Sequence, residues 1–247
     1  MHFQVTHIAS RYFEPPPTRI VLEQTIGILS LISKYKVSYL QRRALSHLST
    51  GYPWTLDAWK CRGENATFLP VTDYSVPYAM VNIPKTLSVL HWQHLSRVRA
   101  FWLLPSVFYE CCWYSIKDIV EHPAWKDPAL DEGLKNAVIM GQLRHVKASH
   151  QVLRFLQKPS KSKCLNPSTC LNIRLLCADQ LLSWSKQNPL GIWDEGDWQL
   201  LDEMCAFCLE TAKIRHTKAC KDLWQGLLEL YELPPWDILL DMKQSSE

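Results

Sequence analysis

The chain has 247 residues, 47% of them hydrophobic and 21% charged, so it can bury a sizeable core and form one or two domains. Its net charge of +3 gives no strong reason to expect nucleic acid or an anionic membrane as a partner. The absence of a signal-peptide pattern or a long apolar run, together with an odd count of nine cysteines, indicates an intracellular protein, cytoplasmic or nuclear, with reduced thiols and no membrane span.

Only eight glycines and few alternating β-branched runs favour helices over sheets. The first pattern begins after the prolines at 15–17 and predicts two helices that are broken at Lys34–Lys36. Apolar residues cover more than one side of the first helix, through Leu22, Ile26, Ile28, Leu29, Leu31 and Ile32. The second helix carries a single apolar stripe, Val37, Leu40, Ala44 and Leu48, and Gly51 and Pro53 end it. The pair predicts an αα-hairpin.

This hairpin also carries a family resemblance. The residues that match are Tyr12, Phe13, Lys34, Tyr35, Val37, Leu40, Arg42, Arg43, Ala44, Leu45, His47, Leu48, Tyr52 and Pro53. In this order they resemble the C-terminal helical hairpin of a BTB/POZ domain, as found in the large group of uncharacterised BTB proteins of mushroom-forming fungi. The resemblance implies a protein-interaction module that self-associates or works as an adaptor or scaffold.

A BTB domain begins with a dimerisation helix and a small sheet, and residues 1–11 are too few to supply them. We therefore expect a truncated BTB region that lacks these elements, and adaptor activity toward a cullin ubiquitin ligase does not carry over with the resemblance.

Further helical patterns follow along the chain. A short helix is predicted over 55–60, a long connection over 61–84, and a second hairpin from helices at 85–97 and 105–112. Beyond the prolines at 123 and 128, helices are predicted over 129–157, 171–186, 198–204 and 208–230, with a last turn at 236–240 and disorder at 1–11 and 243–247. The sequence thus predicts an all-α fold of successive helical hairpins. Its regions are a partial BTB-like helical region at 1–60, a loop at 61–84 and a C-terminal helical region at 85–247.

Four cysteines are the strongest chemical candidates: Cys164, Cys170, Cys205 and Cys208. The first two are expected in the loop after the long helix, and the last two form a C-x-x-C pair. Two thiol pairs from separate segments are typical of a four-thiolate structural zinc site, and the fungal BTB group also tends to place cysteine pairs in these two regions. The alternative is that all four are small hydrophobic residues, with Cys205 and Cys208 facing a core. A redox C-x-x-C is disfavoured, because its neighbours are helical patterns instead of a βαβ unit.

Two function classes follow from these patterns. The first is a non-enzymatic protein–protein interaction module, an adaptor or scaffold whose partners are proteins, including a second copy of the chain. The second is a zinc-stabilised nucleic-acid or chromatin-associated protein, based on the cysteines and on the basic side of the last long helix: Lys213, Arg215, His216, Lys218 and Lys221. A solvated helix face is the favoured interpretation of these charges. No G-x-S-x-G, P-loop, G-x-G-x-x-G or H-E-x-x-H motif occurs, so we predict no catalytic residues, no enzyme, and no cofactor other than a structural zinc.

Overall fold

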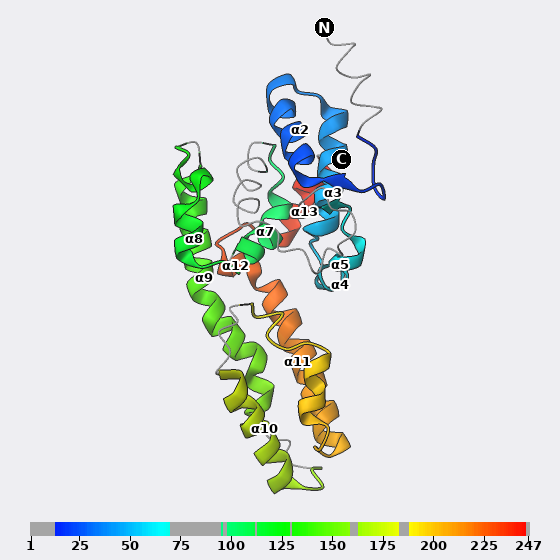
Figure 1. The fold of residues 1–247 in the computed structure, drawn as a ribbon, viewed down its shortest axis with the longest axis vertical. Coiled ribbons are helices and arrows are strands. Elements are labelled where there is room, and N and C mark those ends of the chain that lie inside the picture. The colour runs from blue at the N-terminus through cyan, green and yellow to red at the C-terminus, as the bar shows by residue number, and fades with distance from the viewer. Residues whose placement is uncertain are drawn as a thin grey trace. The chain divides into compact units, whose positions relative to one another are not determined.

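A computed structural model of the chain describes residues 13–69, 95, 98–111, 113–128, 130–158, 163–182 and 188–245. In these ranges the chain is helical apart from a pair of two-residue strands and the connections, so the all-α prediction is confirmed (Figure 1). The chain forms two compact units. Unit 1 comprises Met1–Val138 with Tyr231–Glu247, and unit 2 comprises Ile139–Leu230. The compact units divide the chain at other positions than the predicted regions 1–60, 61–84 and 85–247, which remain a prediction.

Unit 1 contains the predicted helical hairpin. Helix α2 (Leu22–Tyr35) packs on helix α3 (Ser38–Gly51), and the two lie side by side (Figure 1). The break falls where it was predicted. Lys36 adopts a left-handed conformation with φ 53°, and its N–H donates to the carbonyl of Ile32, which closes the last turn of α2. The side chains of Leu29 and Ile32 are buried, whereas Leu31 is 54% exposed, so only part of the apolar surface of α2 is covered.

A short strand pair was not predicted. Strand β1 (Ile20–Val21) pairs in parallel with strand β2 (Phe68–Leu69), which lies in the segment expected to be a loop. The buried ring of His47 holds the neighbouring backbone in place. Its Nδ1 lies 2.8 Å from the hydroxyl of Thr67, and its Nε2 lies 2.7 Å from the carbonyl of Glu14. Burial lowers the pKa of His47. The neutral ring therefore donates from Nε2 and accepts at Nδ1.

Short helices complete unit 1. They are α4 (Leu56–Lys60), α5 (Arg62–Asn65), the 3-10 helix η2 (Phe101–Leu103), α7 (Leu104–Cys111), α8 (Ile116–Glu121), the 3-10 helix η3 (Pro123–Lys126) and α13 (Trp236–Gln244). Every residue of α7 is buried. Helix α5 lies in the expected loop, and α8 was missed although the Ser115 hydroxyl caps it by accepting from the N–H of Asp118. Helix α13 runs to Gln244, so the prediction of disorder from 243 is wrong for 243 and 244. The predicted segments 1–11, 70–84 and most of 85–97 lie outside the described residues.

Unit 2 takes most of the long helices. They are the larger part of α9 (Glu132–Val152), the 3-10 helix η4 (Leu153–Leu156), α10 (Pro167–Leu182), the 3-10 helix η5 (Gly196–Leu201), α11 (Ala206–Gln225) and α12 (Leu227–Leu230). The observed ends of these helices differ from the predicted ones, and local sequence features explain the differences. Helix α9 starts at 132 because the Asp131 carboxylate caps it through the N–H of Leu134 at 2.9 Å. Helix α10 begins at Pro167, four residues before the expected start, because proline suits a first turn. Gly226 separates α11 from α12, which were predicted as one helix.

An aromatic cluster forms the core of unit 2. Phe155 of η4 packs its ring against Trp193, Trp198 and His216, with centroid distances of 5.2, 5.6 and 5.4 Å. Both α10 and α11 pack on η4, the element that carries Phe155. In the described part of the chain, no helix has both the length and the apolar character that crossing a membrane requires.

Candidate metal centre

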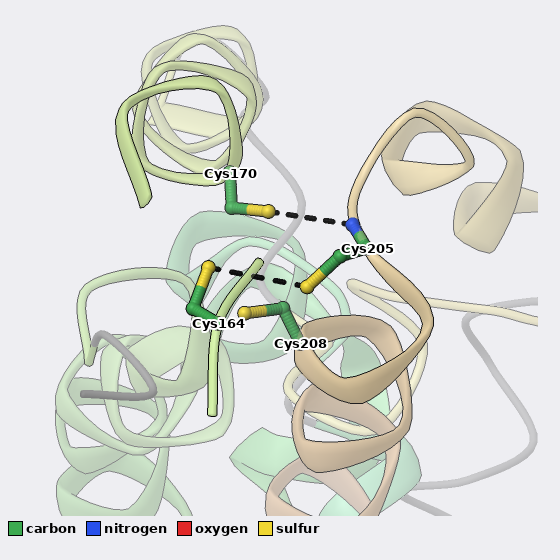
Figure 2. A group of neighbouring side chains, drawn as sticks. All are labelled: Cys164, Cys170, Cys205 and Cys208. Carbon is green, nitrogen blue, oxygen red and sulfur yellow. Dashed lines mark hydrogen bonds between the residues drawn. The ribbon is translucent and has the colours of Figure 1, made fainter. Parts of the chain in front are cut away.

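Four cysteine side chains come together in unit 2, each at or near the start of a helix. Cys164 lies in the segment just before α10, and Cys170 lies in the first turns of that helix. Cys205 is the N-cap residue of α11, and Cys208 follows in its first turn. Figure 2 shows the four sulfur atoms pointing toward a common centre. The expectation that Cys170 belongs to a loop is wrong, because the early start of α10 places it on the helix.

The spacing of the sulfur atoms suits a tetrahedral ion. All four Sγ atoms lie within 4.8 Å of one another, and those of Cys164 and Cys205 are 3.9 Å apart. All four cysteines are free thiols. A tetrahedral zinc ion with Zn–S bonds of about 2.3 Å requires sulfur–sulfur separations of about 3.8 Å. The observed cluster is close to this geometry, so the residues present fit a zinc ion.

The electrostatics of the cluster favour a thiolate at Cys205. The N–H of Cys205 donates to Sγ of Cys170 at 3.3 Å, and the backbone N–H groups of Leu165 and Cys208 lower the pKa of Cys205 to about 6. Burial and the adjacent thiols raise the pKa of Cys170 and of Cys208. The two directions have different main causes, backbone N–H donors at Cys205 and burial at Cys170 and Cys208, and a thiolate at Cys205 adds to the cost of ionising its neighbours. A divalent cation offsets that repulsion and allows all four thiols to ionise.

A buried arginine holds one side of the cluster in position. Arg174 is only 3% exposed. Its Nε donates to the carbonyl of Cys170 at 3.1 Å, and its Nη1 donates to the carbonyl of Lys158 at 2.5 Å. The guanidinium therefore ties the first turns of α10 to the chain just after η4. Such outer contacts orient the residues that carry metal ligands.

The alternative interpretation, four small hydrophobic residues, fits only half of the set. Cys170 and Cys208 are buried, but Cys164 and Cys205 are partly exposed. Hydrophobic burial alone therefore does not explain why Cys164 and Cys205 lie within contact distance of each other. The convergence of all four on one point is the feature that a shared ion accounts for.

The basic side of α11 is largely engaged in contacts within unit 2. Lys213 lies 5.7 Å from the ring centroid of Trp198, and His216 packs on Phe155 and Trp198. Arg215 donates to the carbonyl of Lys158 at 2.7 Å. Lys218 pairs with Asp222 at 2.5 Å. The residues behind the nucleic-acid hypothesis thus serve in part to hold unit 2 together.

One buried ion pair in unit 1 was missed. Glu110 of α7 is 2% exposed and lies 3.8 Å from the guanidinium of Arg62 on α5. The guanidinium carbon of Arg62 lies 3.2 Å from the ring centroid of Trp59 and 4.9 Å from that of Trp113. Burial raises the pKa of Glu110, and Arg62 opposes that shift. The sequence feature that could have indicated this pair is Glu110 itself, the single charged residue in the largely apolar run Leu103–Cys111.

Comparisons of the chain with protein-family models, with curated proteins and with solved structures find no match. The BTB/POZ resemblance of the N-terminal hairpin therefore stays a prediction.

Proposed function

We propose that the chain is a non-enzymatic protein-interaction protein, and that a structural zinc ion bound by Cys164, Cys170, Cys205 and Cys208 holds its unit 2 together. One observation carries the zinc part of the proposal: four thiols from two separate helix starts lie within 4.8 Å of one another.

The ligand set favours a structural over a catalytic ion. Four thiolates fill a tetrahedral zinc, whereas catalytic zinc keeps one position for water or substrate. The ion would join the segment before α10 to the start of α11, which are far apart in sequence. A cross-link that closes a long loop restricts the unfolded chain and so stabilises the folded one.

A matched pair of variants tests the zinc ion. Cys208 and Cys220 are both buried residues of α11, but only Cys208 belongs to the cluster. We expect an equimolar amount of zinc, measured by mass spectrometry, in the purified wild-type chain and in Cys220→Ala, and its loss in Cys208→Ala. A wild-type chain that is produced in zinc-supplemented medium and still contains no zinc would exclude the site.

The interaction role rests on the resemblance of Tyr12–Pro53 to the BTB/POZ hairpin and on the surface of α2. Leu31 and Tyr35 lie four positions apart on that helix and are 54% and 50% exposed. An apolar pair on one helical face suits contact with another protein or with a second copy of the chain. Sedimentation analysis over a range of concentrations tests self-association, and a chain that stays monomeric throughout would limit the partners to other proteins.

The second candidate, a zinc-stabilised nucleic-acid or chromatin-associated protein, keeps the same metal site. The exposed Lys221 favours it, whereas the internal contacts of Lys213, Arg215 and Lys218 count against it. Retention on immobilised DNA and RNA at increasing salt distinguishes the two. Binding with a steep dependence on salt would favour this candidate.

A further inference from the structure

Unit 2 contains a cleft between two of its helices. The faces of α9–η4 and of α11–α12 enclose a volume of about 870 Å³. The cations that line it come from both sides: Arg144, Lys147, Arg154 and Lys158 from the first, and Arg215 and Lys218 from the second. Arg144 and Lys147 belong to α9, Arg154 belongs to η4, and Lys158 follows two residues after the end of η4. Cations therefore line the cleft from both of its sides.

An arginine bridges each end of the cleft. Arg144 reaches from α9 to the last carbonyls of α12, donating to Leu230 at 2.7 Å and to Glu229 at 3.4 Å. At the other end Arg215 reaches from α11 to the carbonyl of Lys158 at 2.7 Å. The two bridges set the spacing of the helices, so the cleft is a built feature of unit 2.

The charge of the cleft is strongly unbalanced. Six cationic side chains line it, against the carboxylates of Asp222 and Glu229. Asp222 is already paired with Lys218. Lys147 and Arg154 are exposed, and neither forms an ion pair with any residue in the part of the chain that the structure describes. A surface of this kind attracts an anionic group.

The floor of the cleft is apolar, and this decides between classes of anion. Ala148, Val152 and Phe155 lie there and are buried. Phe155 is the single aromatic residue of the lining, and its ring is covered by Trp193, Trp198 and His216. Single-stranded nucleic acids need exposed aromatic rings on which bases stack. A basic rim over a small apolar floor suits acidic side chains that alternate with apolar ones.

We propose that this cleft binds an acidic protein segment with interspersed apolar side chains, which places its carboxylates against Lys147 and Arg154 and its apolar residues on the floor. The inference rests on the proposed interaction function and specifies its partner. Residues 144–158 span about 20 Å at the helical rise, so the cleft matches an amphipathic helix of about four turns.

Fluorescence anisotropy with a defined probe tests the proposal on the full-length, zinc-loaded chain. The probe is a labelled peptide of about four helical turns of Glu and Leu, with Leu on one face. Comparison probes are the same peptide with Lys in place of Glu, a Glu peptide without Leu, and RNA and duplex DNA of similar length. We expect the Glu/Leu peptide to bind most tightly. The variant Lys147→Glu/Arg154→Glu should weaken it by at least about tenfold, the loss typical of close charge pairs.

The control variant is Lys117→Glu/Lys126→Glu, which reverses two exposed charges of unit 1; it should bind within about twofold of wild type, because neither residue lines the cleft. Circular dichroism and zinc content should be unchanged in both variants. Failure of the Glu/Leu peptide to bind, or equal binding by wild type and Lys147→Glu/Arg154→Glu, overturns the proposal. In a further outcome, RNA or DNA binds more tightly than the Glu/Leu peptide and loses this binding in Lys147→Glu/Arg154→Glu. That result would overturn the proposal and identify nucleic acid as the ligand of the cleft. Zinc content is measured separately, so loss of the metal site and loss of the cleft function remain distinguishable.

Discussion

His47 shows how one residue of the predicted hairpin fixes structure outside it. Its two ring nitrogens contact Thr67 and the carbonyl of Glu14, so it joins α3 to two segments that are distant in sequence. Burial lowers its pKa below the ordinary value of 6.5, to which it returns in the unfolded chain. In the sequence, His47 was only one of the residues that match the BTB/POZ hairpin. Its hydrogen-bond partners could not be predicted, because they lie in segments with no regular periodicity.

The lowered pKa predicts a pH dependence of stability. Between the folded pKa and 6.5 the unfolded state binds more protons, so the free energy of unfolding should fall as the pH drops below 6.5. His122, whose pKa burial also lowers, contributes with the same sign. Urea unfolding at several pH values checks this, and His47→Gln should flatten the dependence relative to wild type. A pH profile that His47→Gln leaves unchanged would mean that His47 is not the titrating group.

At the level of elements, helix starts were the hardest features to predict, and they decided the geometry of the metal site. The cysteine spacing indicated a four-thiolate set, and the structure brings these residues together. Their placement on helix starts followed from Pro167 and from the extended backbone of Cys205, which helical periodicity does not report. The parallel pair β1–β2 was missed because two-residue strands leave no alternating pattern. The basic cleft was missed because its cations come from two segments, residues 144–158 and 215–218, whose proximity is a tertiary feature that helical periodicity does not report.

The Arg62–Glu110 ion pair joins α5 to α7. Arg62→Met should destabilise unit 1 by about 3 kcal/mol, because it leaves the buried carboxylate of Glu110 without its cation. The double variant Arg62→Met/Glu110→Gln should recover part of this loss, since it removes both charges. Urea unfolding provides the measurement. As a control, Lys117→Met breaks an exposed ion pair with Glu121 and should cost at most about 0.5 kcal/mol. Equal losses of unfolding free energy in Arg62→Met and Lys117→Met would show that the Arg62–Glu110 pair stabilises unit 1 no more than an exposed ion pair does.

At the scale of the whole molecule, the two units depend on different interactions. Unit 1 is built largely on buried apolar residues, including most of α7. Unit 2 combines one aromatic cluster with the four cysteines. If zinc contributes folding free energy only to unit 2, then its removal should loosen one unit and spare the other.

Hydrogen exchange with and without a strong chelator checks this separation. We expect amides in α10 and α11 to lose protection when zinc is removed, whereas amides in α3 and α7 keep theirs. Cys208→Ala should reproduce the effect of the chelator, and Cys220→Ala should not. Uniform loss of protection across both units would show that they fold as one cooperative body, and no loss in α10 and α11 would mean that the four thiols do not stabilise unit 2.

X-ray absorption at the zinc edge of the purified chain tests the metal site most directly. The four converging thiols predict a first shell of sulfur alone, at about 2.3 Å, with zinc equimolar to the chain. A first shell dominated by nitrogen or oxygen at about 2.0 Å, or a chain that carries no zinc after growth in its presence, would contradict the account.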